Sequence, residues 1–99
     1  MARRIIWTES AWQDLEEIAV YIERDSKHYA SAFVREVRNA ALSLTVLSER
    51  GRPVPEVNLP TVREIFVRSY RLIYQITRTE IYIVALVHGA RDLKNKGVL

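Results

Sequence analysis

The segment from Val62 to Asp92 constrains the fold more than any other part of the sequence. Three apolar-rich runs follow one another in it, at residues 62–67, 70–77 and 81–88. Because only short polar breaks separate the runs, they predict a three-stranded antiparallel meander. The third run is apolar on both faces except at Tyr82 and His88. That pattern is typical of a central strand, so we expect a helical layer on one face and another segment on the other.

Two amphipathic helices are predicted upstream of the meander. The first should run from about Ser10 to Asp25, with Ser10 and Gln13 placed as a capping box. The second should run from about His28 to Leu47. Since the link between them is so short, the helices should pack as an antiparallel hairpin.

Residues 3–7 are β-branched and aromatic and predict a first strand, which we expect to join the same sheet. Residues 48–61 hold all three prolines and should form an irregular loop. The sequence therefore predicts one α+β domain over residues 1–99. An N-terminal strand and an antiparallel two-helix hairpin pack with a mainly antiparallel sheet that contains the C-terminal meander.

The positive charge belongs to the meander half of the chain. The formal net charge is +3, but residues 1–49 carry six basic and eight acidic side chains, whereas residues 50–99 carry nine and four. Twelve of the fifteen basic residues are arginine, which suits bidentate pairing with phosphate or carboxylate. A positive contact surface and an ordinary solvated face are both compatible with this composition.

Several classes of protein are excluded. There is no cysteine, so a disulfide framework and a thiolate metal site are ruled out. No apolar run in the sequence is long enough for a signal peptide or a membrane span, so we expect neither. We expect a cytoplasmic protein that needs no cofactor, no metal and no membrane.

Three motifs in order give a resemblance to a known family. Trp7-Thr8 precedes Ala11 and Asp14-Leu15, Tyr70–Tyr74 reads YRLIY, and Val87–Leu93 reads VHGARDL. Together they resemble the ParE/RelE superfamily of bacterial toxins from type II toxin–antitoxin systems, across nearly the whole chain. The RelE-like branch cleaves messenger RNA on the ribosome, whereas the ParE-like branch inhibits DNA gyrase.

The ending favours the ParE-like branch. Ribonuclease members of the family typically carry a tyrosine near the C-terminus, but residues 93–99 contain neither tyrosine nor histidine. The loop at residues 48–61 has arginines and no lysine, whereas RelE-like enzymes tend to be lysine-rich there. The resemblance thus implies a plasmid-stabilising, growth-arresting toxin that inhibits gyrase, with a RelE-like nuclease or a degenerate non-toxic member as alternatives.

Candidate site residues differ between the branches. Cleavage by a 2′-hydroxyl needs a base, an acid and cations for the phosphorane. If the chain is a nuclease, its candidate catalytic residues are Arg71, His88, Arg91 and Glu64. If it is a gyrase inhibitor, the candidate contact residues are His88 and Arg91 near the C-terminal tail, together with one cationic face that we expect Arg63, Arg68 and Arg71 to form.

Structural roles compete with these assignments. Arg71 could pair with Glu64 across the hairpin, and Arg91 with Asp92 or a helix terminus. His88 could be structural, and Tyr70 and Tyr74 are more typical of sheet packing than of base stacking.

The resemblance also implies partners. These are a cognate antitoxin, joined in a hetero-oligomer through an amphipathic helix, and either DNA gyrase or the ribosome with messenger RNA.

Overall fold

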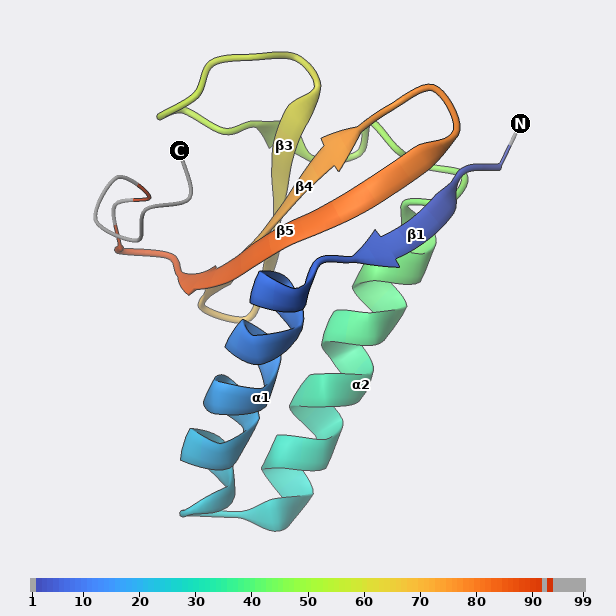
Figure 1. Ribbon diagram of the computed structural model, residues 1–99. Helices are drawn as coiled ribbons and strands as arrows, with labels where there is room; N and C mark the ends of the chain where they lie inside the picture. The colour runs from blue at the N-terminus through green and yellow to red at the C-terminus, as the bar shows by residue number, and fades with distance from the viewer. Residues whose placement is uncertain (1, 92, 94–99) are drawn as a thin grey trace.

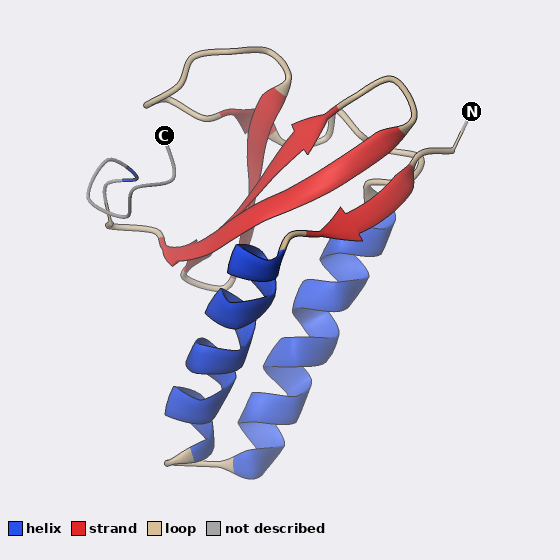
Figure 2. Ribbon diagram, in the orientation of Figure 1, coloured by secondary structure: helices blue, strands red, loops and turns tan. Residues whose placement is uncertain are grey.

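The computed structural model describes residues 2–91 and 93, which form a sheet with a helical hairpin against one face (Figure 1). The elements in chain order are β1 (Arg4–Trp7), α1 (Glu9–Glu23), α2 (Lys27–Ser43), β2 (Arg52–Pro53), β3 (Val62–Val67), β4 (Tyr70–Ile76) and β5 (Glu80–His88). Figure 2 shows the two layers by colour, with both helices on the same side of the sheet. Neither described helix is long and apolar enough to cross a membrane.

The sheet has the strand order β1-β5-β4-β3-β2, in which only the β1–β5 pair is parallel. The predicted α+β class and mainly antiparallel meander are therefore confirmed. β5 lies between two strands, as its two-sided apolar pattern predicts. A register shift between Ile73 and Tyr74 interrupts the β4–β5 ladder.

The helix boundaries differ from the prediction. Thr8, not Ser10, caps α1, because its hydroxyl accepts from the Ala11 N–H at 3.1 Å. Ser26 caps α2 in the same way. α2 ends at Ser43 rather than near Leu47, because the chain turns there toward the sheet. After this turn the Ser48 carbonyl accepts from the Tyr74 hydroxyl of β4 at 2.7 Å.

The main core lies between the sheet and the helices. Apolar side chains from both layers fill it, and the largest of those that are fully buried are Tyr74, Phe33, Leu15, Leu44, Leu72, Ile81, Ile83 and Leu86. Tyr74 is a packing residue, as expected, and Tyr70 packs edge-on against Phe33 with ring centroids 5.2 Å apart.

The opposite face of the sheet is covered by loop residues rather than by a second layer. Val54 and Leu93 are fully buried there, against Ile73, Ala85 and Val87. The loop after β2 and the chain just past β5 are therefore the segments that complete the two-sided burial of β5.

Candidate functional site

A cluster of charges, centred on buried Arg71 and Glu64, occupies the sheet face away from the helices. Arg71 of β4 donates from Nε to Glu64 Oε1 of β3 at 2.7 Å. Its Nη1 and Nη2 donate to the two carboxylate oxygens of Glu56, in the loop before β3, at 2.9 and 2.7 Å. Arg52 of β2 completes the cluster by donating to Glu64 Oε2 at 2.7 Å. The cluster thus joins three strands and the long loop.

The same cluster holds the chain where it leaves β5. Arg71 Nη1 also donates to the carbonyl of Arg91 at 3.1 Å, and Glu56 Oε2 accepts from the Leu93 N–H at 3.4 Å. The hydrogen bonds from Arg71 are the main reason why the pKa of Glu56 falls from 4.5 to about 2. Pairing with Glu56 likewise raises the pKa of the Arg71 guanidinium.

Arg71 and Glu64 are consequently occupied by each other. They are only 5% and 1% exposed, so neither lies on an open surface. The alternative in which Arg71 pairs with Glu64 across the hairpin is confirmed. Glu56 was missed in the sequence, because a single carboxylate in an irregular loop has no periodicity to mark it.

Arg63 and Arg68 lie elsewhere. Arg63, on β3, donates to the carbonyls of Pro60 and Gly51 at 2.8 and 2.7 Å, and so ties the loop to the sheet. Its side chain leaves the sheet on the opposite face from that of Glu64, because neighbouring residues of a strand alternate. The expectation of one cationic face formed by Arg63, Arg68 and Arg71 is therefore wrong in its geometry.

Arg68 occupies the two-residue turn between β3 and β4. Its φ of 55° is positive, as the first position of a tight hairpin turn often requires. The guanidinium donates to both carboxylate oxygens of Glu36 on α2, at 3.1 and 2.6 Å, and lies 5.8 Å from the Phe33 ring centroid. This pair lowers the pKa of the Glu36 carboxyl.

His88 and Arg91 are exposed at the end of β5. The His88 ring packs edge-on against Tyr70 at 5.6 Å, and its Nδ1 accepts from the Ala90 N–H at 3.2 Å. The Arg91 guanidinium makes no ion pair with any described residue. The alternative that pairs Arg91 with Asp92 lies outside the described residues.

This end of β5 meets the turn that carries Arg68. Tyr70 is in register with His88, and the Gly89 N–H donates to the Ser69 carbonyl at 2.7 Å. Arg68, His88 and Arg91 are therefore the candidates that the fold brings to one end of the sheet. We call these three side chains the exit surface.

A hollow of about 150 Å³ opens beside the exit surface. Its lining residues come from α1, β4 and the end of β5: Asp14, Glu17, Ile18, Tyr70, Leu86, Val87, His88 and Arg91. Asp14 is 7% exposed, and its Oδ2 accepts from the Leu86 N–H at 3.1 Å. The pairing of β1 with β5 ends at Ile83, so the Leu86 N–H lies beyond it on the same edge of β5. The Asp14 carboxylate gives this N–H its hydrogen-bond acceptor.

The four nuclease candidates do not form one constellation. Arg71 is in register with Val87, and both side chains lie on the face away from the helices. His88 follows Val87 and lies on the other face, against Tyr70. The arrangement offers a buried structural pair on one face and an exposed histidine and arginine on the other. Within residues 2–91 and 93, no group of three histidine, cysteine or acidic side chains is placed to hold a metal ion.

Comparisons with known proteins find a family model and relatives that match most of the chain. The family model described as the ParE toxin of the type II toxin-antitoxin system, parDE, matches residues 5–93. Toxin RelE2 of Caulobacter vibrioides is 33% identical over 89 residues, which cover 89% of this chain and 97% of that protein. Putative toxin Y4kP of Sinorhizobium fredii is 31% identical over 89 residues, or 88% of each chain.

A solved structure titled the chromosomal ParDE TA system from P. aeruginosa has the same fold. Its chain superposes with a TM-score of 0.71 at 20% identity, covering 88% of this chain and 96% of that one. The match to residues 5–93, which include the whole meander, and the two curated relatives establish the family. This chain belongs to the ParE toxin family of type II toxin–antitoxin systems.

Proposed function

We propose that this protein is a toxin that inhibits DNA gyrase and is neutralised by a cognate antitoxin. Membership of the family supports the toxin role. The choice of gyrase rests on one observation, which is that Arg71 and Glu64 are buried in an ion cluster instead of facing a substrate.

That observation bears on RNA cleavage because the reaction needs its groups together. A base, an acid and cations must meet around one phosphate within hydrogen-bonding distance. Here Arg71 and Glu64 lie on the sheet face opposite His88, and all three nitrogens of the Arg71 guanidinium already donate to carboxylates. An inhibitor that acts by contact needs no such constellation.

The exit surface is the contact site that we favour. His88 and Arg91 are exposed, and Arg68 adds a partly exposed cation at the same end of the sheet. The exposed ring of Phe66 lies close to Gly89, the residue after His88, since a Cβ added at Gly89 would stand 3.0 Å from it. Arginine is enriched in protein-binding hot spots, which supports these exposed cations as contact residues.

The antitoxin is the second partner of this proposal. A solved relative carries the name of a ParDE system, which supports a paired antitoxin for this chain. Because gyrase acts on DNA in the cytoplasm, the proposal also places this protein there.

A supercoiling assay tests the proposal. Purified protein should inhibit gyrase and accumulate the cleaved gyrase–DNA complex. Arg91→Ala should weaken this inhibition at least tenfold, because it removes an exposed cation without disturbing any ion pair of the described chain. Arg78→Ala is the matched control, since Arg78 is an exposed arginine of the β4–β5 turn, and it should inhibit like the wild type. If Arg91→Ala and Arg78→Ala lose the same amount of gyrase inhibition, the exit surface is not the contact site.

A RelE-like nuclease is the second candidate. The observations that favour it are an exposed His88 next to Arg91 and a curated relative named RelE2. It predicts that ribosome-bound messages are cut by the wild type and spared by His88→Ala, with gyrase unaffected.

A further inference from the structure

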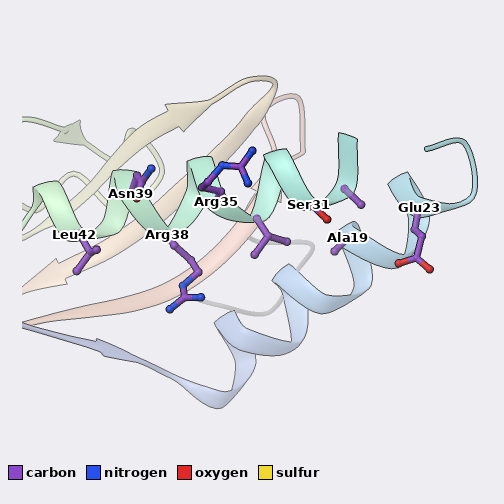
Figure 3. A pocket seen from close by; sticks show the side chains of 9 residues that line it. Ala19, Glu23, Ser31, Arg35, Arg38, Asn39 and Leu42 are labelled. Atoms are coloured by element: carbon purple, nitrogen blue, oxygen red, sulfur yellow. The ribbon is translucent and has the colours of Figure 1, made fainter. Parts of the chain in front are cut away.

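The outward face of the helical hairpin holds an open groove of about 530 Å³ (Figure 3). Residues of both helices line it: Ala19, Glu23, Ala30, Ser31, Val34, Arg35, Arg38, Asn39 and Leu42. The lining residues Ala19, Ala30 and Ser31 are small, so another helix can approach closely. The groove lies on the side of the hairpin away from the sheet.

The two walls of this groove carry opposite charges. On α1, Trp12, Glu16, Ala19 and Glu23 recur at spacings of four, three and four, so they share one stripe. On α2, Ser31, Arg35, Arg38 and Leu42 recur at the same spacings. The α1 stripe is therefore acidic and the α2 stripe basic.

These four charges are not neutralised by a direct contact within the described chain. Glu16, Glu23, Arg35 and Arg38 are all exposed, and none takes part in an ion pair or a side-chain hydrogen bond. More widely, α1 holds five acidic residues and no basic one, whereas α2 holds three basic residues and one acidic. A face built in this way is complementary to itself.

The same face exposes apolar side chains. Trp12 and Leu42 are 43% and 60% exposed, and they lie at the same end of the hairpin because the helices are antiparallel. Val46, just beyond α2 along the Leu42 stripe, is 76% exposed. These side chains give the face an apolar part at that end of the hairpin, where a specific interface can bury them.

We infer that a second copy of this chain occupies the groove, so that two hairpins pack face to face about a two-fold axis parallel to the helices. Such an axis sets α1 of one copy against α2 of the other. Glu16 and Glu23 then face the partner copy's basic stripe, and the reverse contact forms by symmetry. An acidic partner helix would instead be repelled by the α1 wall.

The size of the face sets the expected strength. Two helices of this length side by side present roughly 500 Å². That is below the area that stable complexes bury per partner, so the dimer should dissociate in the micromolar range. The inference does not depend on the toxin's target.

Sedimentation velocity on the purified chain tests the dimer. The wild type should be dimeric at about 100 µM in low salt and should dissociate as salt rises, because the charge pairs are screened. Arg35→Glu with Arg38→Glu should weaken the dimer at least tenfold, since both walls become acidic. Glu16→Arg with Glu23→Arg should do the same, since both become basic. Arg78→Glu, an exposed charge reversal in the β4–β5 turn, should have no effect.

Mixing the two double variants is the decisive step. Each should be monomeric alone, and together they should form a heterodimer at least as stable as the wild-type dimer, which also shows that both are folded. A wild type that stays monomeric at every concentration would overturn the inference, leaving an antitoxin as the occupant. A dimer that both variants leave intact, or a mixture that stays monomeric, would overturn it equally.

Discussion

The guanidinium of Arg71 meets the carboxylate of Glu56 through two parallel hydrogen bonds, of 2.9 and 2.7 Å, and so ties the middle strand to the loop before β3. Through the carbonyl of Arg91 and the N–H of Leu93, the same pair also reaches the chain beyond β5. Arg71 thus helps to fix the segment that carries the exit surface.

Replacing Arg71 should therefore destabilise the fold strongly. Arg71→Met leaves Glu56 and part of Glu64 without a cation in a mostly buried place, which should lower the free energy of unfolding by about 3–5 kcal/mol. Urea unfolding followed by circular dichroism measures this. Arg78→Met, at an exposed position, should change it by less than about 0.5 kcal/mol. A loss below about 1 kcal/mol in Arg71→Met would show that the cluster is not structural.

Stability should depend on pH through Glu56. Its pKa is about 2 in the folded state against 4.5 ordinarily, so the carboxylate stabilises the fold above about pH 4.5 and loses this effect as the pH falls toward 2. We expect the ionised Glu56 carboxylate to add about 2 kcal/mol to the free energy of unfolding near pH 7. This is less than the pKa difference alone implies, because a fifth of the side chain is exposed and solvent screens its charge.

Comparison with Glu56→Gln measures this contribution. The free energies of unfolding of the two proteins, measured by urea titration, should differ by about 2 kcal/mol near pH 7. The two values should converge as the pH falls. A difference that stays constant down to about pH 2.5 would mean that the ionised carboxylate is not the source of the stability.

Gly51 should not tolerate a side chain. A Cβ there would stand 2.5 Å from the Glu64 carbonyl oxygen and 2.6 Å from the Tyr74 hydroxyl, which accepts from the Gly51 N–H at 3.0 Å. Gly51→Ala should cost about 1–3 kcal/mol, because β3 or the tyrosine must move. Thermal unfolding measures it, with exposed Gln75→Ala as the control. Unchanged stability would show that this contact relaxes freely.

The two helix caps should differ in strength. Thr8 accepts from the Ala11 N–H and also donates to the Ile83 carbonyl at 2.9 Å, whereas Ser26 accepts only from the Tyr29 N–H at 3.2 Å. Ser26→Ala should cost about 1 kcal/mol and Thr8→Ala about 2 kcal/mol. Unfolding free energies measured side by side check this order, and an equal or reversed cost would contradict it.

The sequence predicts the meander well because its signal is local. The bounds of β3 agree with the prediction, and β4 and β5 differ by one residue, since alternation and short turns set them. The N-cap of α1 was predicted at Ser10, two residues too late, because Ser10 also fits a capping pattern. The hydroxyl of the true cap, Thr8, is held by a strand residue that is 75 positions away in the sequence.

The candidate site was less accessible to prediction. Alternation pairs Glu64 with Arg71 across one hairpin, but nothing local places Glu56 or the chain near Leu93 against them. These contacts depend on how the loop crosses the sheet, which is a tertiary property. The parallel pairing of β1 with β5 depends on tertiary packing in the same way.

The central claim is best tested by adding the purified wild-type protein, in parallel, to gyrase with plasmid DNA and to ribosomes carrying a message. We predict that supercoiling is inhibited, that cleaved gyrase–DNA complexes accumulate and that the message stays intact. Cleavage of the message with gyrase unaffected would contradict the account.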